Sequence, residues 1–361
     1  MTTDHDQLLE DLLEGNHRAL ARTISTIENR APGYRELVSE LYAHAGDADV
    51  IGITGSPGAG KSTLVDKLAE SYRERGDTVG VIAIDPSSPF TGGAVLGDRI
   101  RMAATIGDMD VFVRSMSARG TLGGLSTATA DAVKAMDAFG KDKIIIETVG
   151  AGQNEIDIVR TADTVAVLVP PGSGDSIQTL KAGILEIADV FVVNKADRPG
   201  ADRTVQELSE MIELGEGTSS IDTGHHGPDA MADQSTWADT DDTDSQWTPP
   251  IVETVATDGD GIDALIDTFT DHRSHLEETG ELAERTRRRY AEEIRTLVRE
   301  DVHALLETEL ERAGGVTALA DAVRRGDTDP YTIATQALSP VETCLDQLDT
   351  HPLESGSSDD R

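Results

Sequence analysis

The octapeptide GSPGAGKS at residues 55–62 constrains this chain more than any other feature of its sequence. The apolar run 50–55 that leads into it predicts a buried strand, and the segment 61–76 after it has the spacing of a helix. A strand, a glycine-rich loop and a helix in this order match the pattern GxxxxGK followed by Ser or Thr, whose backbone N–H groups surround a phosphate. The sequence therefore predicts a nucleotide-phosphate site formed by Gly55, Ser56, Pro57, Gly58, Ala59, Gly60, Lys61, Ser62 and Thr63.

Two side chains of this loop have expected chemical roles. Lys61 is expected to reach the β- and γ-phosphates, where its positive charge assists phosphoryl transfer. The hydroxyl of Ser62 is expected to bind Mg²⁺. The loop therefore predicts a nucleoside triphosphate and Mg²⁺ as ligands.

Strands and helices are predicted to alternate after this loop. Apolar runs predict strands at 78–85, 110–115, 143–148, 164–170, 189–195 and 249–256. Helical patterns separate several of them, at 125–139, 179–187 and 261–276. This alternation predicts an α/β fold with a mostly parallel sheet and helices on both faces.

The segment NKAD at 194–197 follows one of these strands and indicates which base is bound. The carboxylate of Asp197 can accept hydrogen bonds from both N1–H and the exocyclic amine of guanine, and adenine lacks this pair of donors. Asn194 and Lys195 belong to the same motif, and Ala256 is expected to present its backbone N–H to the guanine oxygen. With the phosphate loop, the motif predicts GTP and GDP rather than adenine nucleotides, and a sheet of the P-loop GTPase type.

Acidic residues between the two motifs are candidates for the metal and for catalysis. Asp85 and Glu147 each end a predicted strand, and Asp98 lies in a glycine-rich segment suited to movement. Gly150 is expected to donate its N–H to the γ-phosphate, and Gln153 to orient the attacking water or else simply to face solvent. Lys181 lies at the start of a predicted helix and is a further candidate. We expect it to have a functional role rather than to be an ordinary surface residue.

The charge balance excludes two classes of partner. The chain has 31 basic and 67 acidic residues, a formal net charge of −36, which repels nucleic acid and anionic membranes. Only 7 of the basic residues are lysine, and the acidic excess is spread along the chain, a composition typical of proteins from salt-accumulating cells. A single cysteine, Cys344, excludes an internal disulfide and a cysteine cage for a metal. The polar, acidic start and the lack of a long apolar stretch predict a cytoplasmic protein.

Helical patterns flank the nucleotide-binding part on both sides. We expect a helical extension at 1–46, a P-loop domain at 47–275 with an acidic loop at 215–248, a helical arm at 276–350 and a disordered tail at 351–361. Trp247 is expected to anchor the end of the acidic loop onto the core. The basic run of the C-terminal arm is expected to form ion-paired helix surface: Arg285, Arg287, Arg288 and Arg289.

The chain resembles the methylmalonyl-CoA mutase-associated GTPases, in the metallochaperone-like branch of P-loop GTPases. These are cobalamin chaperones, also described as arginine/ornithine transport system kinases. The matching segments are 14–30, GSPGAGKST (55–63), DPSSPFTGGAVLGDRIRM (85–102), ETVGAGQNE (147–155), NKAD (194–197) and WTPPIV (247–252). The resemblance covers nearly the whole chain. The sequence departs from the family pattern in the acidic loop and in the segment ETVA at 253–256.

The resemblance implies a GTPase whose nucleotide state gates the delivery of adenosylcobalamin to methylmalonyl-CoA mutase and protects that enzyme. It implies that Asp85, Asp98 and Glu147 are the Mg²⁺ and switch acids. It also implies that Lys181 lies in a switch segment that responds to the client mutase, and that the C-terminal helices form a homodimer.

Three other functions remain as alternatives. A GTPase that delivers nickel would share both nucleotide motifs, but it needs a cluster of Cys and His ligands, and Cys344 is alone. A kinase acting on a transport protein fits a guanine-binding motif poorly. A dimeric scaffold that binds nucleotide without hydrolysing it is disfavoured by the presence of Lys61, Ser62 and Glu147.

Overall fold

The computed structural model describes residues 2–85, 108–117, 124–148, 158, 161–172, 187–218 and 247–348. The chain divides into two compact units, Met1–Arg289 and Tyr290–Arg361. Within the described ranges, no helix combines the length and the apolar character that crossing a membrane requires.

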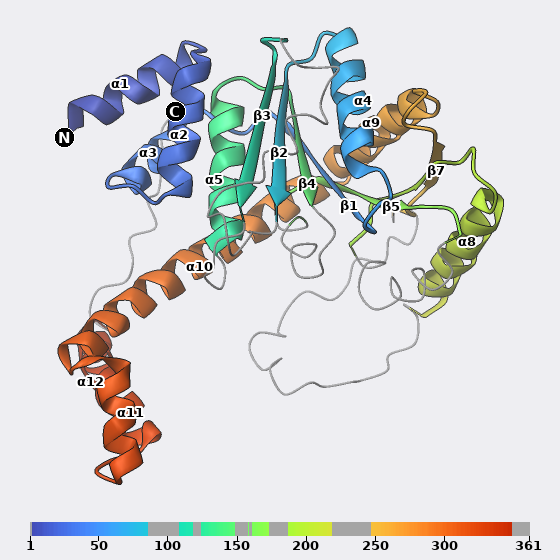
Figure 1. Cartoon of the computed structure of the whole chain (residues 1–361). Helices are drawn as coiled ribbons and strands as arrows, with labels where there is room; N and C mark the ends of the chain where they lie inside the picture. Colours follow the sequence, from blue (N-terminus) through green and yellow to red (C-terminus); the bar gives the residue numbers. More distant parts are fainter. Residues whose placement is uncertain are drawn as a thin grey trace. The chain divides into compact units, whose positions relative to one another are not determined.

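In the described part of the first unit the strands form a seven-stranded sheet in which every neighbouring pair is parallel. The strand order is β3-β2-β4-β1-β5-β6-β7, so the strand that carries the phosphate loop lies at the centre. All the strands predicted from the sequence are present, and the predicted α/β class is confirmed (Figure 1). Their bounds are β1 (Asp49–Gly55), β2 (Val79–Asp85), β3 (Val111–Ser117), β4 (Lys143–Thr148), β5 (Thr164–Val169), β6 (Val190–Asn194) and β7 (Ile251–Thr254).

Helices cover both faces of this sheet because the central strands are apolar on both sides. Along β5, Val165 and Val167 face one core, and Ala166 and Leu168 face the other, as the two-residue repeat of a strand requires. One core is completed by α4 (Lys61–Glu74) and α9 (Ile262–Glu278). The opposite core receives α5 (Gly124–Ala138) and α8 (Ala201–Thr218).

The N-terminal helices extend this second core. They are α1 (Thr2–Leu13), α2 (His17–Glu28) and α3 (Tyr34–Leu41), and Figure 1 shows them beside α5. Leu12, Leu20 and Ile24 are fully buried, which confirms the helical periodicity of the sequence. Asn16 begins α2 as an N-cap, since its side-chain oxygen accepts hydrogen bonds from the N–H groups of residues 18 and 19 at 3.0 and 3.4 Å.

Two outcomes concern the predicted acidic loop. Helix α8 continues to Thr218, so the first residues predicted as loop are helical, and residues 219–246 lie outside the described ranges. The predicted anchor is confirmed, because the indole N–H of Trp247 donates to the backbone oxygen of Asp189 at 2.8 Å. The Trp247 ring also packs at 4.8 Å from the ring of His272 and at 5.4 Å from that of His275.

The C-terminal segment is helical, as predicted. Its helices are α10 (Glu281–Arg312), α11 (Gly315–Arg325) and α12 (Pro330–Leu348), and α10 begins in the first unit and ends in the second. No residue of α10 is buried, and Ile294, Val298 and Leu305 are 61%, 56% and 65% exposed. Among the described residues of the second unit, α10 therefore carries an exposed apolar stripe.

Candidate nucleotide-binding site

The phosphate loop connects the end of β1 with the start of α4, and at two of its glycines a side chain would also collide with neighbouring atoms. Gly55 has φ 133°, and a Cβ there would lie 2.2 Å from the backbone oxygen of Leu168 on β5. Gly60 has φ 98°, and a Cβ there would lie 2.5 Å from the side-chain nitrogen of Asn194. Glycine is therefore required both by the left-handed backbone and by the close approach of neighbouring atoms.

Lys61 is held inside the loop that it terminates. Its side-chain nitrogen donates to the backbone oxygens of Gly55 and Ser56, at 2.7 and 3.1 Å, and the residue is buried. Lys61 is also the first residue of α4, so the ammonium group and the helix N-terminus lie together. Both favour negative charge, so the place suits a polyphosphate.

A second polar contact joins the start of α4 to the end of β4. The hydroxyl of Ser62 donates to a carboxylate oxygen of Glu147 at 2.6 Å. Glu147 is buried and lies opposite Ile53 of β1 and Ala83 of β2 in the register of the sheet. A hydroxyl and a carboxylate are hard oxygen ligands of the type that Mg²⁺ prefers, so this pair fits the predicted metal.

The guanine motif is tied to the phosphate loop through Asn194. Its side-chain nitrogen donates to the backbone oxygen of Ala59 at 2.8 Å. Its side-chain oxygen accepts from the hydroxyl of Thr254 at 3.1 Å and from the backbone N–H of Ala256 at 3.2 Å. One buried side chain thus connects the loops that follow β1, β6 and β7.

Lys195 adds a second connection between these loops. Its side-chain nitrogen donates to the backbone oxygen of Gly58 at 2.6 Å, and its own φ is 65°, in the left-handed region. Asp197, two residues on, is exposed. The carboxylate predicted to read the base is therefore accessible at the carboxyl edge of the sheet, which is where ligands bind in parallel α/β folds.

The other predicted residues have different outcomes. The backbone of Asp85 ends β2, beside Ser117 of β3, and its side chain is not described. The N–H of Ala256, predicted to contact the base, bonds to Asn194 in this structure, so the base contact stays a prediction. Four predicted residues lie outside the described ranges: Asp98, Gly150, Gln153 and Lys181.

Sequence reasoning missed three threonines that support the site. The hydroxyl of Thr148 donates to that of Thr54 at 2.9 Å, which joins β4 to β1 just below the phosphate loop. Both are fully buried, and Thr254 is 1% exposed. Their signal in the sequence is a hydroxyl at the end of an otherwise apolar strand.

A comparison with protein families shows which family the chain belongs to. The family model described as methylmalonyl-CoA mutase-associated GTPase MeaB matches residues 20–311. The chain belongs to this family. Membership confirms the resemblance inferred from the motifs, and it makes guanine nucleotide the class of ligand expected for the loop.

Relatives of this GTPase family match most of the chain. A Pyrococcus abyssi protein, provisionally named a GTPase, is 46% identical over 93% of this chain and 96% of its own length. The GTPase ArgK of Escherichia coli is 30% identical over 92% of this chain and 95% of its own length. The mitochondrial methylmalonic aciduria type A homolog of Mus musculus is 30% identical over 82% of this chain and 70% of its own length.

A solved structure supports the fold. The crystal structure of a LAO/AO transport system kinase matches with a TM-score of 0.62 and covers 95% of this chain and 99% of that one. The two sequences are 22% identical, so this similarity concerns the fold alone.

Proposed function

We propose that this MeaB-family protein is an Mg²⁺-dependent GTPase whose nucleotide state gates its action as a chaperone of adenosylcobalamin-dependent methylmalonyl-CoA mutase. The observation that carries the chemistry is the 2.6 Å contact between Ser62 and Glu147 at the start of α4. It brings two metal-type ligands next to the phosphate loop. The client is proposed from the family to which the chain belongs.

Hydrolysis needs positioning and charge neutralisation more than covalent chemistry by the protein. In the proposed reaction water attacks the γ-phosphorus, the bond from that phosphorus to the β–γ bridging oxygen breaks, and GDP leaves. The loop N–H groups hold the phosphates, and Lys61 neutralises charge on the β- and γ-phosphates. Ser62 and Glu147 would hold Mg²⁺, directly or through water, and the ion supplies further neutralisation of the phosphate oxygens.

Asp85 and Asp98 are proposed as further metal and switch acids, and Gly150 as a donor to the γ-phosphate. Gln153 is proposed to orient the water. Lys181 is proposed to act in the switch segment that responds to the mutase. These roles rest on the sequence motifs and on family membership.

Base selection is proposed to come from Asp197 and the loop that contains Ala256. Asn194 is hydrogen-bonded to both this loop and the phosphate loop, which supports base and phosphate subsites that act as one unit. An adenine nucleotide would leave the Asp197 carboxylate without its two donors, and a missing hydrogen bond is strongly discriminating.

A homodimer is also proposed. The stripe of exposed apolar side chains on α10 comprises Tyr290, Ile294, Val298, Val302 and Leu305. These residues recur at intervals of three and four, the spacing at which two helices pack along one seam. A second copy of the chain would bury this stripe.

The test combines turnover with client capture. GTP hydrolysis is measured with and without Mg²⁺, for the wild type and for Lys61→Ala, with ATP as the competing substrate. The tagged protein, loaded with GDP or with a non-hydrolysable GTP analogue, is then used to capture proteins from its own cells. We expect GTP-specific, Mg²⁺-dependent turnover and recovery of a cobalamin-dependent acyl-CoA mutase in a yield that depends on the nucleotide.

Each contrary outcome removes a defined part of the proposal. No turnover with nucleotide bound would favour the scaffold alternative. Recovery of nickel-enzyme assembly proteins, or phosphorylation of a transport protein, would replace the mutase as the client. ATP turnover equal to GTP turnover would remove the assigned role of Asp197.

A further inference from the structure

A row of buried aspartates marks the edge of the sheet opposite the nucleotide site. Asp49 begins β1, Asp163 directly precedes β5, and Asp189 directly precedes β6. Their exposed fractions are 7%, 4% and 8%. Buried carboxylates need cationic or hydrogen-bonding partners, and for this aspartate row the partners come largely from α9 and α10.

Asp163 is the most heavily bonded member of the row. Its carboxylate lies 2.7 Å from the guanidinium of Arg289 on α10 and 3.2 Å from that of Arg273 on α9. It also accepts the backbone N–H of Val50 at 3.2 Å, and its own N–H donates to the Val50 oxygen at 2.7 Å. Arg289 donates in addition to the backbone oxygen of Thr161 at 2.5 Å.

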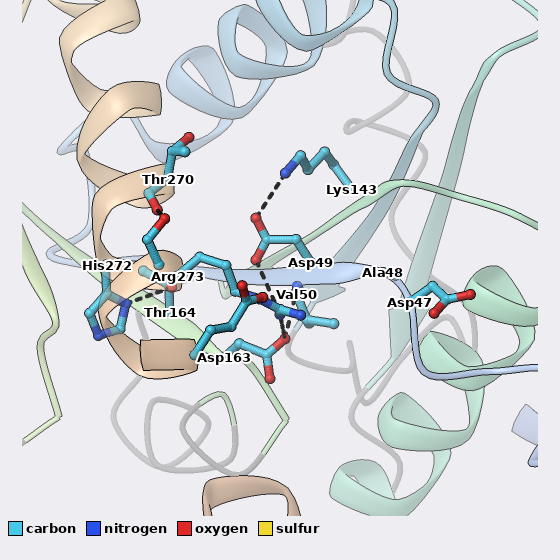
Figure 2. Close-up of polar contacts among 12 residues, drawn as sticks. Asp47, Ala48, Asp49, Val50, Lys143, Asp163, Thr164, Thr270, His272 and Arg273 are labelled. Carbon is cyan, nitrogen blue, oxygen red and sulfur yellow. Dashed lines mark hydrogen bonds and ion pairs between the residues drawn. The ribbon is translucent and has the colours of Figure 1, made fainter. Parts of the chain in front are cut away.

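Arg273 and a third arginine, Arg285, reach the neighbouring members of the row. Figure 2 shows Arg273 lying between Asp163 and Asp49, and Lys143 pairs with Asp49 from the other side at 3.0 Å. Arg285 of α10 donates to the backbone oxygen of Asp163 and to the carboxylate of Asp189, both at 3.1 Å. Two turns of α10 are thus bonded to the starts of two adjacent strands.

The strands that start at this row end at the nucleotide site. Strand β1 runs from Asp49 to Gly55, whose backbone oxygen accepts from Lys61. Strand β6 ends at Asn194, and β5 passes so close to Gly55 at Leu168 that no side chain fits between them. A displacement at the row would therefore be carried along short strands to the residues that are proposed to contact nucleotide.

We propose that Arg285 and Arg289 form a clasp that couples the nucleotide site to α10, so that α10 changes its hold on the sheet with the nucleotide state. The inference rests on the proposed nucleotide switch. Helix α10 suits this role because it continues without glycine or proline from the clasp through Arg312 and carries the exposed apolar stripe. Coupling of this kind is reciprocal, so a partner bound to α10 would change nucleotide affinity.

The same chain provides a matched control for the clasp. Arg287 lies between the two clasp residues in the sequence, and its only described ion pair is to Glu284 one turn earlier on α10, at 2.7 Å. Its side chain is 68% exposed, against 28% for Arg285 and 21% for Arg289. Arg287→Gln therefore removes the same charge from the same helix without touching the row.

The experiment is hydrogen–deuterium exchange on the full chain with GDP or with guanosine 5′-(β,γ-imido)triphosphate bound. In the wild type we expect exchange in the first turns of α10 to differ between the two nucleotides. Arg289→Gln is expected to lose that difference while the phosphate loop keeps its protection by nucleotide. Arg287→Gln is expected to behave as the wild type.

Two results would overturn the clasp. One is equal exchange of α10 with both nucleotides in the wild type, and the other is an unchanged difference in Arg289→Gln. A phosphate loop that no nucleotide protects would instead refute the proposed function, and the clasp with it. If Arg289→Gln does not fold, Arg289→Lys replaces it, since lysine keeps the charge but loses the planar fork that reaches both Asp163 and Thr161. An unchanged difference in that variant also overturns the clasp.

Discussion

The hydroxyl of Ser62 donates to the carboxylate of Glu147 across 2.6 Å, and this contact joins the helix after the phosphate loop to the end of the neighbouring strand β4. The two residues are 85 positions apart in the sequence. The parallel sheet brings them together because β4 pairs directly with β1. Strand pairing thus aligns the two side chains that are proposed as metal ligands.

The first prediction concerns the charge of Glu147. Glu147→Gln keeps the volume and a hydrogen-bond acceptor for Ser62 but removes the negative charge that favours Mg²⁺. We expect GTP turnover to fall about 10- to 100-fold and the Mg²⁺ concentration for half-maximal turnover to rise. Phosphate release measured across a Mg²⁺ titration checks this. Glu70→Gln, which alters a carboxylate on α4 that pairs with Lys67, serves as the control, and an unchanged Mg²⁺ dependence in Glu147→Gln would refute the role.

The second prediction concerns base selection by Asp197. An asparagine there offers an amide N–H where the aspartate offers only acceptors, so the guanine amine loses its partner. Xanthine has a carbonyl oxygen on the ring carbon that carries the exocyclic amine in guanine. This oxygen can accept a hydrogen bond from the N–H of the new asparagine. We expect Asp197→Asn to weaken GTP binding at least about 100-fold and to bind XTP better than GTP. Competition binding measures both nucleotides, and Asp202→Asn, an exposed change at the start of α8, is the control. A variant that still prefers GTP would show that Asp197 does not read the base.

The strands and the phosphate loop were predictable because their signals are local. Each apolar run between loop residues became a strand, and GSPGAGKS lies between β1 and α4 as the pattern requires. The bridging role of Asn194 was not predictable, because it depends on Ala59 and Thr254, which are 135 and 60 positions away. Only the strand order, which the sequence does not state, puts these loops side by side.

The basic run on α10 shows the same limit. The sequence predicts ion-paired helix surface for all four arginines, and Arg287 confirms this with its partner Glu284 on the same helix. Arg285 also confirms it through Glu281 at 3.0 Å, but Arg285 and Arg289, one helical turn apart, both reach the aspartate row as well. Helical spacing places these two arginines on a different face of α10 from Arg287. Which of these faces contacts the sheet depends on residues that are distant in the sequence.

The third prediction concerns acid stability. Burial alone would raise the pKa of Asp189, but the His272 ring nitrogen 3.3 Å from its carboxylate and the Arg285 guanidinium at 3.1 Å outweigh burial and hold the pKa below its usual value. A carboxyl with a lowered folded-state pKa contributes stability above its unfolded pKa of about 4, and that contribution is lost as the pH falls through the folded value. We expect Asp189→Asn to lower the free energy of unfolding by about 2 kcal/mol at neutral pH.

The pH dependence distinguishes this charge effect from a simple packing defect. The difference between Asp189→Asn and the wild type is expected to shrink as the pH is lowered from about 5 to about 2. Urea unfolding at fixed KCl measures it, with Asp271→Asn, an exposed change on α9, as the control. A difference that stays constant across this range would show that the charge of Asp189 does not contribute.

The fourth prediction concerns salt, where two electrostatic effects oppose each other. Salt weakens surface ion pairs such as Arg287–Glu284, but each exposed pair contributes only about 0 to 1 kcal/mol. The repulsion within a net charge of −36 is long-range, and raising KCl from about 0.1 M to about 1 M shortens the screening length from about 10 Å to about 3 Å. Relief of repulsion should therefore dominate, and we expect the Tm to rise with KCl at neutral pH.

The control is the same titration near the sequence pI of 4.4, where the net charge is small and the rise should largely disappear. A Tm that is flat or falls with KCl at neutral pH would contradict the inference that the acidic excess is an adaptation to salt.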